Sequence, residues 1–495
     1  MKKNDEAEVP VTDLTEEGFG IGHTAEGYAL FVKGALPGDR VVAHVTKVMK
    51  KYGYAIVSEY LERSPDRTAP LCSACGKCGG CTLQELLYEA QLEYKRKRVA
   101  DALERTGGIR GLSVPLPVHD SPVRYRNKAE IPVCKSRNGE PAAGYYAVHS
   151  HRIVPCGDCI LSPEEVNRIR DEVIIFMKEN GISAYEDPSS EGPGSRNGHS
   201  GQRGDKGKGF VRHIVVRRSE STGEILLCMV VNGNKPGKLA GMRLEGVDTL
   251  CVNYNTADTN VIFGSRTEVI YGRGYITEHI GDLKYRVYAA SFFQVNTRIT
   301  EKLYGAVKEF VSGIVPSQHE DSVPGKGEMS ERRLPTVWDL YCGAGTIGLY
   351  VAKAASRVAG IEISPVSVKS AAENARENGI TNAEFLQGAA EDRAKELMEI
   401  TGRPDVIILD PPRKGCDRRL LDTVLDVSPS SLIYVSCNPS TLARDLAVLS
   451  SDYAIRDIRL YDMFPNTGHV ETVCLLSNRK PDARVKIDVD LEDYY

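Results

Sequence analysis

The sequence predicts an α/β fold: a doubly wound parallel sheet in the C-terminal part, a small β-barrel at the N-terminus and a β-rich region between them. Three observations support this prediction. From residue 336 onward, short apolar runs alternate with helical patterns. Residues 10–62 hold short β-rich runs separated by glycines, and residues 120–290 are mostly β-like. Repeated βα units indicate a parallel sheet, because each crossover helix returns the chain for another strand in the same direction.

The N-terminal segment is expected to form the barrel. Turn-rich segments separate its strand-like runs, which occur at 19–22, 28–32, 40–45 and 54–57. About five short strands in so short a segment indicate an OB-like barrel, although any other small β module fits the pattern equally well.

The C-terminal region gives an ordered series of strands and helices. The expected strands are 337–341, 358–362, 384–386, 405–409, 432–435, 454–460 and 470–476. The expected helices are 298–312, one from about 346, 365–378, 390–400, 418–426 and 440–450. We therefore divide the chain into a barrel (1–62), a cysteine-containing β-rich central region (63–290), a doubly wound domain (291–480) and an acidic tail (481–495).

Composition places some limits on function. The 495 residues carry a formal net charge of −4, which is no overall signature of nucleic-acid binding. Basic runs at 95–98, 124–128 and 212–218 fit RNA contact or, more commonly, solvated surface. No apolar run is long enough to cross a membrane, and the start lacks the apolar core of a signal peptide. We expect a monomeric cytoplasmic protein in which cysteines serve metal binding or catalysis rather than disulfides.

A glycine-rich turn, DLYCGAGTIGL, follows the first strand of the doubly wound region. Gly343 and Gly345 allow the backbone to approach a ligand closely, and Asp339 precedes them. Glu362 ends the second strand, where a carboxylate can accept both hydroxyls of a ribose. This arrangement is nearer to the loop that binds S-adenosylmethionine than to the dinucleotide fingerprint, and NAD binding is the alternative.

A cysteine stands where another strand ends. Cys437, in SCNPSTLARD, follows the strand at 432–435 and precedes a helical pattern, so we expect the helix N-terminus to lower the pKa of its thiol. Asp410, in DPPRKG, ends the preceding strand, and Glu471, in GHVETV, begins the last one. A thiolate that adds to carbon 6 of a pyrimidine makes carbon 5 nucleophilic toward a methyl donor, and a separate base must then remove the carbon 5 proton.

Cysteines also cluster between the barrel and the central sheet. LCSACGKCGGCTLQ contains Cys72, Cys75, Cys78 and Cys81, and PCGDCILSP adds Cys156 and Cys159. Four thiolates hold either zinc or a [4Fe–4S] cluster, and spacing alone does not choose between them.

In their order and spacing, DLYCGAGTIGL, DPPRKG, SCNPSTLARD and GHVETV resemble the RNA uracil-5 methyltransferase family, and SFFQVN (291–296) matches the block before its methyl-donor domain. The resemblance implies a Rossmann-like class I methyltransferase domain and an N-terminal TRAM domain, an OB-like RNA-binding module. It implies Cys437 as nucleophile and Glu471 as proton acceptor. The residues that it implies as contacts of S-adenosylmethionine are Gln294, Tyr341, Glu362 and Asp410.

The ribosomal-RNA branch of this family carries a [4Fe–4S] cluster on a C-x5-C-x2-C pattern and one distant cysteine. The resemblance therefore implies Cys72, Cys78, Cys81 and Cys159 as ligands, with zinc as the alternative metal; Cys75 and Cys156 depart from the pattern and either could replace a ligand. It implies RNA, most of all 23S ribosomal RNA, as substrate. The alternatives are transfer-RNA uracil-5 methylation, cytosine-5 methylation of RNA, and a non-catalytic RNA-binding assembly factor.

Overall fold

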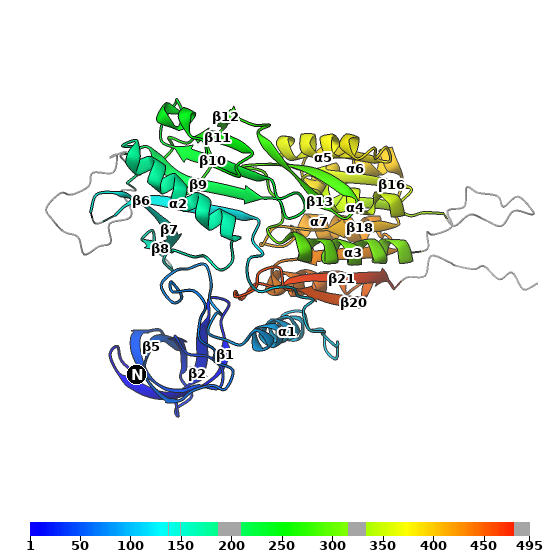
Figure 1. Ribbon diagram of the computed structural model, residues 1–495. Coiled ribbons are helices and arrows are strands. Elements are labelled where there is room, and N and C mark those ends of the chain that lie inside the picture. Colours follow the sequence, from blue (N-terminus) through cyan, green and yellow to red (C-terminus); the bar gives the residue numbers. More distant parts are fainter. Residues whose placement is uncertain (137, 149, 187–208, 315–332, 480–495) are drawn as a thin grey trace, which may run out of the picture. The chain divides into compact units, whose positions relative to one another are not determined.

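The computed structural model describes residues 1–136, 138–148, 150–186, 209–314 and 333–479 (Figure 1). The chain divides into two compact units. The β-rich unit comprises Met1–Lys97, Leu116–Glu301 and Asp462–Val470, and the α/β unit comprises Arg98–Pro115, Lys302–Tyr461 and Glu471–Tyr495. The acidic tail expected at 481–495 lies outside the described residues, and the three boundaries between the four segments expected from the sequence remain predictions.

The N-terminal segment forms a closed five-stranded barrel in the order β1-β2-β3-β5-β4, which confirms the predicted OB-like module. Its strands are β1 (Glu6–Leu14), β2 (Phe19–His23), β3 (Ala29–Lys33), β4 (Arg40–Val48) and β5 (Tyr52–Glu62). Alternate residues fill the barrel, among them Val9, Leu30 and Val41, all with no exposed surface. The pattern missed most of β1, because only every second or third of its residues is apolar and glutamates separate them.

The central region contains a seven-stranded sheet in the order β12-β11-β10-β9-β6-β7-β8 and a two-stranded hairpin, β13-β14. The strands of the sheet are β6 (Lys128–Lys135), β7 (Pro141–Tyr146), β8 (Ile153–Pro155), β9 (Val211–Arg218), β10 (Ile225–Val231), β11 (Thr249–Tyr254) and β12 (Arg266–Tyr271). The hairpin joins β13 (Tyr275–Ile280) to β14 (Leu283–Tyr288), and the helices of this unit and its boundary are α1 (Tyr88–Arg105), α2 (Glu164–Glu179) and η1 (Gly237–Gly241). We expected mostly β-structure here, so α2 is a difference; it buries Val166, Ile169 and Val173 in one core with the sheet.

The α/β unit confirms the doubly wound prediction (Figure 1). Its sheet has the order β17-β16-β15-β18-β19-β21-β20, with β15 to β19 parallel and β21 antiparallel to β19. The strands are β15 (Thr336–Leu340), β16 (Arg357–Glu362), β17 (Ala383–Gln387), β18 (Val406–Leu409), β19 (Ser431–Ser436), β20 (Tyr453–Tyr461) and β21 (Glu471–Asn478). The helices are α3 (Thr297–Gly313), whose residues up to Glu301 belong to the β-rich unit, α4 (Thr346–Val351), η2 (Ala352–Ala354), α5 (Pro365–Glu377), α6 (Ala390–Thr401), α7 (Arg418–Val427) and α8 (Pro439–Leu449).

The strand order creates a switch point at β15. The chain continues from β15 to β16 on one side and later returns to β18 on the other. In open α/β sheets, ligands bind in the crevice at the carboxyl ends of the strands on either side of such a point. We therefore expect a ligand to bind where β15, β16 and β18 end.

Candidate active site

The loop after β15 has the backbone shape of a ligand-binding turn. Tyr341, Gly343 and Gly345 have φ values of 72°, 55° and 76°, all in the left-handed region. A Cβ at Gly345 would lie 3.0 Å from the Phe385 ring, so glycine is required there, whereas a Cβ at Gly343 would meet open space. Tyr341 is not a glycine, so its left-handed backbone conformation is strained. Its amide donates a 3.0 Å hydrogen bond to the Ile361 carbonyl, which helps to hold this conformation.

Two carboxylates fix this loop. Glu362 accepts the amide of Gly343 at 3.2 Å with one oxygen and the amide of Ser364 at 2.8 Å with the other. Asp339, 1% exposed, accepts the amide of Gly348 at 2.8 Å through Oδ2, while its Oδ1 has no hydrogen-bond partner. Burial, followed by the Asp410 charge, raises the pKa of Asp339 to about 7. A buried oxygen without a partner, beside a loop of open backbone, suits a polar ligand such as S-adenosylmethionine.

The structure brings Cys437 and Glu471 together. Ser436 of β19 pairs with Thr472 of β21, so the next pair in that antiparallel register sets Cys437 opposite Glu471. Asp410 follows Leu409, which pairs with Tyr434 of β19, and thus ends at the same edge of the sheet. The three side chains affect one another electrostatically.

Proton affinities in this group are far from their ordinary values. Burial raises the pKa of Asp410 to about 7. Burial and the Asp410 charge raise the pKa of Glu471, which is 6% exposed, to about 8. Burial, Glu471 and Asp410 raise the pKa of the Cys437 thiol to about 11. The expectation of a lowered thiol pKa is therefore wrong for this state of the protein, because burial and two carboxyl groups outweigh the helix N-terminus at Asn438.

The loop after β18 is attached to α8. Asp445, 0% exposed, accepts the amide of Cys416 at 2.8 Å and the hydroxyl of Tyr434 at 2.6 Å. Arg444 pairs with Asp445 at 2.7 Å and donates to the Lys414 carbonyl at 3.0 Å. These contacts connect the loop to the helix that follows Cys437.

Arg413, on the same loop, is exposed, and its positive charge lowers the pKa values of Cys437 and Glu471 against the larger effect of burial. Neighbouring side chains hold its backbone: Asn438 and Thr441 each donate to the Arg413 carbonyl at 3.3 Å. The sequence analysis assigned no role to Arg413, although its place directly after Asp410-Pro411-Pro412 was an available signal.

Gln294 belongs to the β-rich unit, just before α3. Its carbonyl accepts a hydrogen bond of 2.8 Å from the Asn127 side chain, which also donates to Thr297 at 3.1 Å. Its expected contact with S-adenosylmethionine remains a prediction.

The cysteines expected to bind a metal gather in the β-rich unit. Cys72, Cys78 and Cys159 pack against one small apolar cluster, and Cys72, Cys81 and Cys159 pack against a second. Within the described ranges, no three His, Cys, Asp or Glu side chains have the arrangement of a metal site. The ligand set is therefore not confirmed.

The basic runs that suggested RNA contact have other partners. Lys95 is fully buried and pairs with Asp462 at 2.5 Å. Arg212 donates to the Asn255 and Ala257 carbonyls at 3.0 and 2.7 Å, and Arg217 donates to the Ala289 carbonyl at 3.1 Å. These residues stabilise the β-rich unit and are not solvated surface.

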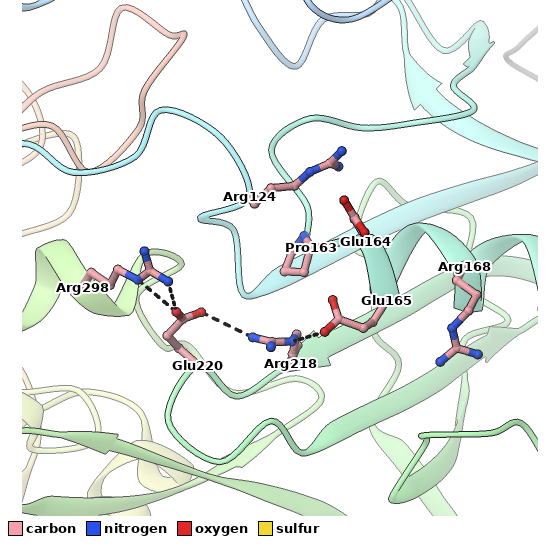
Figure 2. Close-up of a pocket in the computed structure, with 8 residues that line it drawn as sticks. All are labelled: Arg124, Pro163, Glu164, Glu165, Arg168, Arg218, Glu220 and Arg298. Atoms are coloured by element: carbon pink, nitrogen blue, oxygen red, sulfur yellow. Dashed lines mark hydrogen bonds and ion pairs between the residues drawn. The ribbon is translucent and has the colours of Figure 1, made fainter.

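A polar hollow of about 700 Å³ lies in the same unit (Figure 2). Its charged lining is four arginines and three glutamates: Arg124, Arg168, Arg218, Arg298, Glu164, Glu165 and Glu220. Each arginine already has a carboxylate partner. The pairs are Arg124–Asp158, Arg168–Glu172, Arg218–Glu165 and Arg298–Glu220. The hollow consequently offers little uncompensated positive charge to a phosphate.

Among the described residues, no helix is long and apolar enough to span a membrane.

Comparison with known proteins adds two family matches. Residues 252–479 match the tRNA (Uracil-5-)-methyltransferase family, and residues 2–57 match the TRAM domain. An uncharacterized RNA methyltransferase of Halalkalibacterium halodurans is 40% identical over 484 residues, which cover 96% of this chain and 98% of that protein. One of Clostridium acetobutylicum is 36% identical over 486 residues, with 96% and 98% covered.

A solved structure agrees with these matches. The tRNA (uracil-54, C5)-methyltransferase of Pyrococcus abyssi, in complex with S-adenosyl-L-homocysteine, is 27% identical and covers 95% of this chain and 100% of its own, with a TM-score of 0.71. The fold, the glycine-rich loop after β15 and the family matches thus define an S-adenosylmethionine-dependent RNA methyltransferase. The chain belongs to the RNA uracil-5 methyltransferase family.

Proposed function

We propose that this protein methylates carbon 5 of a uridine in RNA through a covalent adduct between Cys437 and carbon 6 of the ring. The observation that supports this most directly is the pairing of β19 with β21, which sets the nucleophile opposite a buried carboxyl group. The uracil-5 family match supports uracil over cytosine as the base.

In the proposed reaction, the Cys437 thiol loses its proton to a neighbouring carboxylate, and its sulfur bonds to carbon 6. The electron pair of the C5–C6 double bond moves toward the carbonyl at carbon 4, and carbon 5 bonds to the methyl carbon. S-adenosylmethionine, when bound, would supply that methyl group: its sulfonium–methyl bond would break, and the bonding electron pair would stay on the sulfur of the departing S-adenosylhomocysteine. Glu471 then takes the proton from carbon 5, the double bond forms again and the thiolate leaves. A carboxyl group whose pKa is about 8 is suited to both holding and releasing a proton near neutral pH.

The residues that we propose for the methyl donor are Tyr341, Glu362, Asp410 and Gln294. Glu362 already accepts two backbone amides, so its position at the end of β16 is held before any ligand binds. Its carboxylate oxygens retain lone pairs for two ribose hydroxyls. The unpartnered oxygen of Asp339 gives the same crevice a further acceptor.

For the substrate we propose 23S ribosomal RNA, with transfer RNA as the specific alternative. The cysteine pattern, which resembles that of the ribosomal-RNA branch, favours ribosomal RNA. The Pyrococcus abyssi protein, named as a tRNA enzyme, matches 95% of this chain, so overall architecture alone does not separate the two substrates. A non-catalytic assembly factor would not need Cys437 and Glu471 side by side.

We also propose that Cys72, Cys78, Cys81 and Cys159 hold a [4Fe–4S] cluster, with zinc as the alternative. Their convergence on two adjoining apolar clusters, from segments separated by many residues, supports this ligand set. A cluster there would crosslink the segment after the barrel to the start of α2. Anaerobic reconstitution with iron and sulfide, followed by absorption spectroscopy and metal analysis, distinguishes the two metals.

The adduct is tested with RNA that contains 5-fluorouridine. A base cannot remove fluorine from carbon 5 as it removes a proton, so the thiolate is not eliminated and the covalent complex persists. We expect S-adenosylmethionine-dependent trapping on the peptide that contains Cys437, none for Cys437→Ala, and normal trapping for the control Cys134→Ala on β6. An adduct elsewhere, or normal methylation by Cys437→Ala, contradicts the proposal. Mapping of 5-methyluridine in ribosomal and transfer RNA from cells without the protein identifies the substrate.

A further inference from the structure

The barrel carries a cluster of aromatic rings on its outer surface. Phe19 of β2, Phe31 of β3, and Tyr52 and Tyr54 of β5 are all partly exposed. The ring centroids of Phe31 lie 5.2 Å from Tyr52 and 5.6 Å from Tyr54, and those of Tyr52 and Tyr54 lie 5.9 Å apart. Phe19 extends the cluster at 6.2 Å from Tyr54. We call these four residues the aromatic face.

Strand register explains why the rings gather. Ile21, Phe31 and Tyr54 are partners across β2, β3 and β5, and paired residues point to the same side of a sheet. The intervening residues Leu30, Val32 and Ala55 point inward and are buried. The four rings are therefore not needed to fill the barrel, whose interior is complete without them.

The charge next to the aromatic face is positive. Lys47 of β4 is the cross-strand partner of Tyr54, Lys33 is the partner of Phe19, and both lysines are exposed. Neither β2 nor β3 contains an acidic residue. Partly exposed rings with exposed lysines beside them fit a ligand that has both flat apolar faces and negative charge.

Other candidate RNA surfaces are less suitable. The basic runs at 95–98 and 212–218 contain buried, hydrogen-bonded residues, and the arginines of the polar hollow have carboxylate partners. Single-stranded nucleic acids bind by stacking bases on aromatic side chains while lysines neutralise the backbone.

We propose that the aromatic face stacks unpaired bases of the RNA substrate outside the target uridine, while Lys33 and Lys47 contact the adjoining phosphates. This proposal rests on the proposed function, since it concerns the same RNA. It implies that the enzyme selects substrates with an unpaired stretch in addition to the uridine that it methylates. The rings would contribute to substrate binding and not to the chemical step.

The test uses the full-length protein in two forms. Phe31→Leu/Tyr54→Leu keeps apolar bulk and removes the rings, whereas Phe31→Tyr/Tyr54→Phe keeps the rings and is the matched control. Equal thermal melting of both variants and the parent protein shows that folding is intact; if the leucine pair unfolds the barrel, Tyr54→Leu alone replaces it. Affinity is measured by fluorescence anisotropy with a single-stranded RNA of about 12 nucleotides and with a duplex of the same length.

We expect the leucine variant to bind single-stranded RNA about 5- to 150-fold more weakly for each base that loses its stacking partner, with duplex binding unchanged and the control equal to the parent. Lys33→Gln/Lys47→Gln should reduce the slope of log affinity against log salt by about 1.4. In a methylation assay with an RNA substrate, the leucine variant should have a higher KM than the parent protein and the same kcat.

Unchanged single-strand affinity in the leucine variant overturns the proposal, and so does equal weakening by the ring-retaining control. If the leucine variant instead keeps RNA affinity and loses a bound protein, the surface is a protein-docking site and the proposal is wrong. Failure of the proposed function looks different: 5-fluorouridine RNA then yields no adduct at Cys437, although loss of the rings still weakens binding.

Discussion

Replacing Glu471 with glutamine should stabilise the protein at alkaline pH and change its stability little in acid. In the folded chain, burial and the Asp410 charge raise the pKa of Glu471 from 4.5 to about 8. The folded state therefore binds this proton more tightly than the unfolded state does. The resulting stability is complete below about pH 4.5 and is lost as the pH rises through about 8, because above that value the buried carboxylate must be charged.

The size of the effect follows from the pKa difference. Each pKa unit corresponds to about 1.4 kcal/mol. Relative to its value in acid, the contribution of Glu471 to the unfolding free energy is therefore lower by about 1 kcal/mol near pH 5 and by about 4 to 5 kcal/mol near pH 9. Glutamine is neutral throughout and nearly the same shape. The unfolding free energy of Glu471→Gln relative to the parent should thus rise by about 4 kcal/mol between these two pH values.

Urea unfolding followed by tryptophan fluorescence measures this difference. Trp338, the only tryptophan of the sequence, is fully buried on β15 in the same unit as Glu471, so its emission reports on the relevant part of the molecule. Glu399→Gln, an exposed change on α6, is the matched control and should show no such pH dependence. A constant difference between Glu471→Gln and the parent across the pH range would refute the argument that burial raises the pKa of Glu471.

Three further predictions test other parts of the structure. Alkylation of Cys437 by iodoacetamide in the free protein should accelerate about tenfold per pH unit between about pH 7 and 10, because its thiol pKa is about 11; a plateau near pH 9, as for glutathione, contradicts this. Asp445→Asn should lower kcat about 10- to 100-fold with a smaller effect on RNA affinity, since it loosens the loop that Tyr434 and Asp445 hold; equal kcat values would show that the attachment is dispensable. Lys95→Met should cost about 3 to 5 kcal/mol in thermal or urea unfolding followed by circular dichroism, because Asp462 is left charged and buried, and adding Asp462→Asn should recover part of the loss.

Strand and helix positions in the α/β unit were predictable because each element carries a strong local pattern. β19 is a continuous apolar run that ends at Ser436, and α8 begins with Pro439 after the cap at Asn438. The contact between Cys437 and Glu471 is not local. β20 precedes β21 in the chain yet lies at the edge of the sheet, and β21 is inserted between β19 and β20. Apolar periodicity does not encode that order, and the family resemblance implied only that Cys437 and Glu471 act in the same reaction.

The aromatic face shows a signal that was present and not used. In YGYAIV and ALFVK, rings occupy positions that alternate with the buried residues of the barrel. Alternation identifies which side of a strand is buried, and rings on the opposite side need another explanation. For the basic runs, the sequence suggested a surface that the structure does not have. Their charge was visible in the sequence, but the burial of Lys95 and Arg217 depends on contacts with distant segments.

The high pKa of Cys437 has a consequence for how the enzyme rests between turnovers. With a pKa of about 11, only about one thiol in ten thousand is ionised near neutral pH, so the free enzyme exposes little thiolate to oxidants. Asp410 and Glu471, whose pKa values are about 7 and 8, lie close to the thiol, and a negative charge on either of them disfavours the thiolate. Any change that neutralises one of them, or brings the positive charge of Arg413 closer, favours the thiolate. We expect RNA binding to have such an effect, so iodoacetamide should label Cys437 faster when a non-reactive RNA is bound without covering the thiol. If the labelling rate per accessible thiol is the same with and without RNA, activation does not depend on substrate.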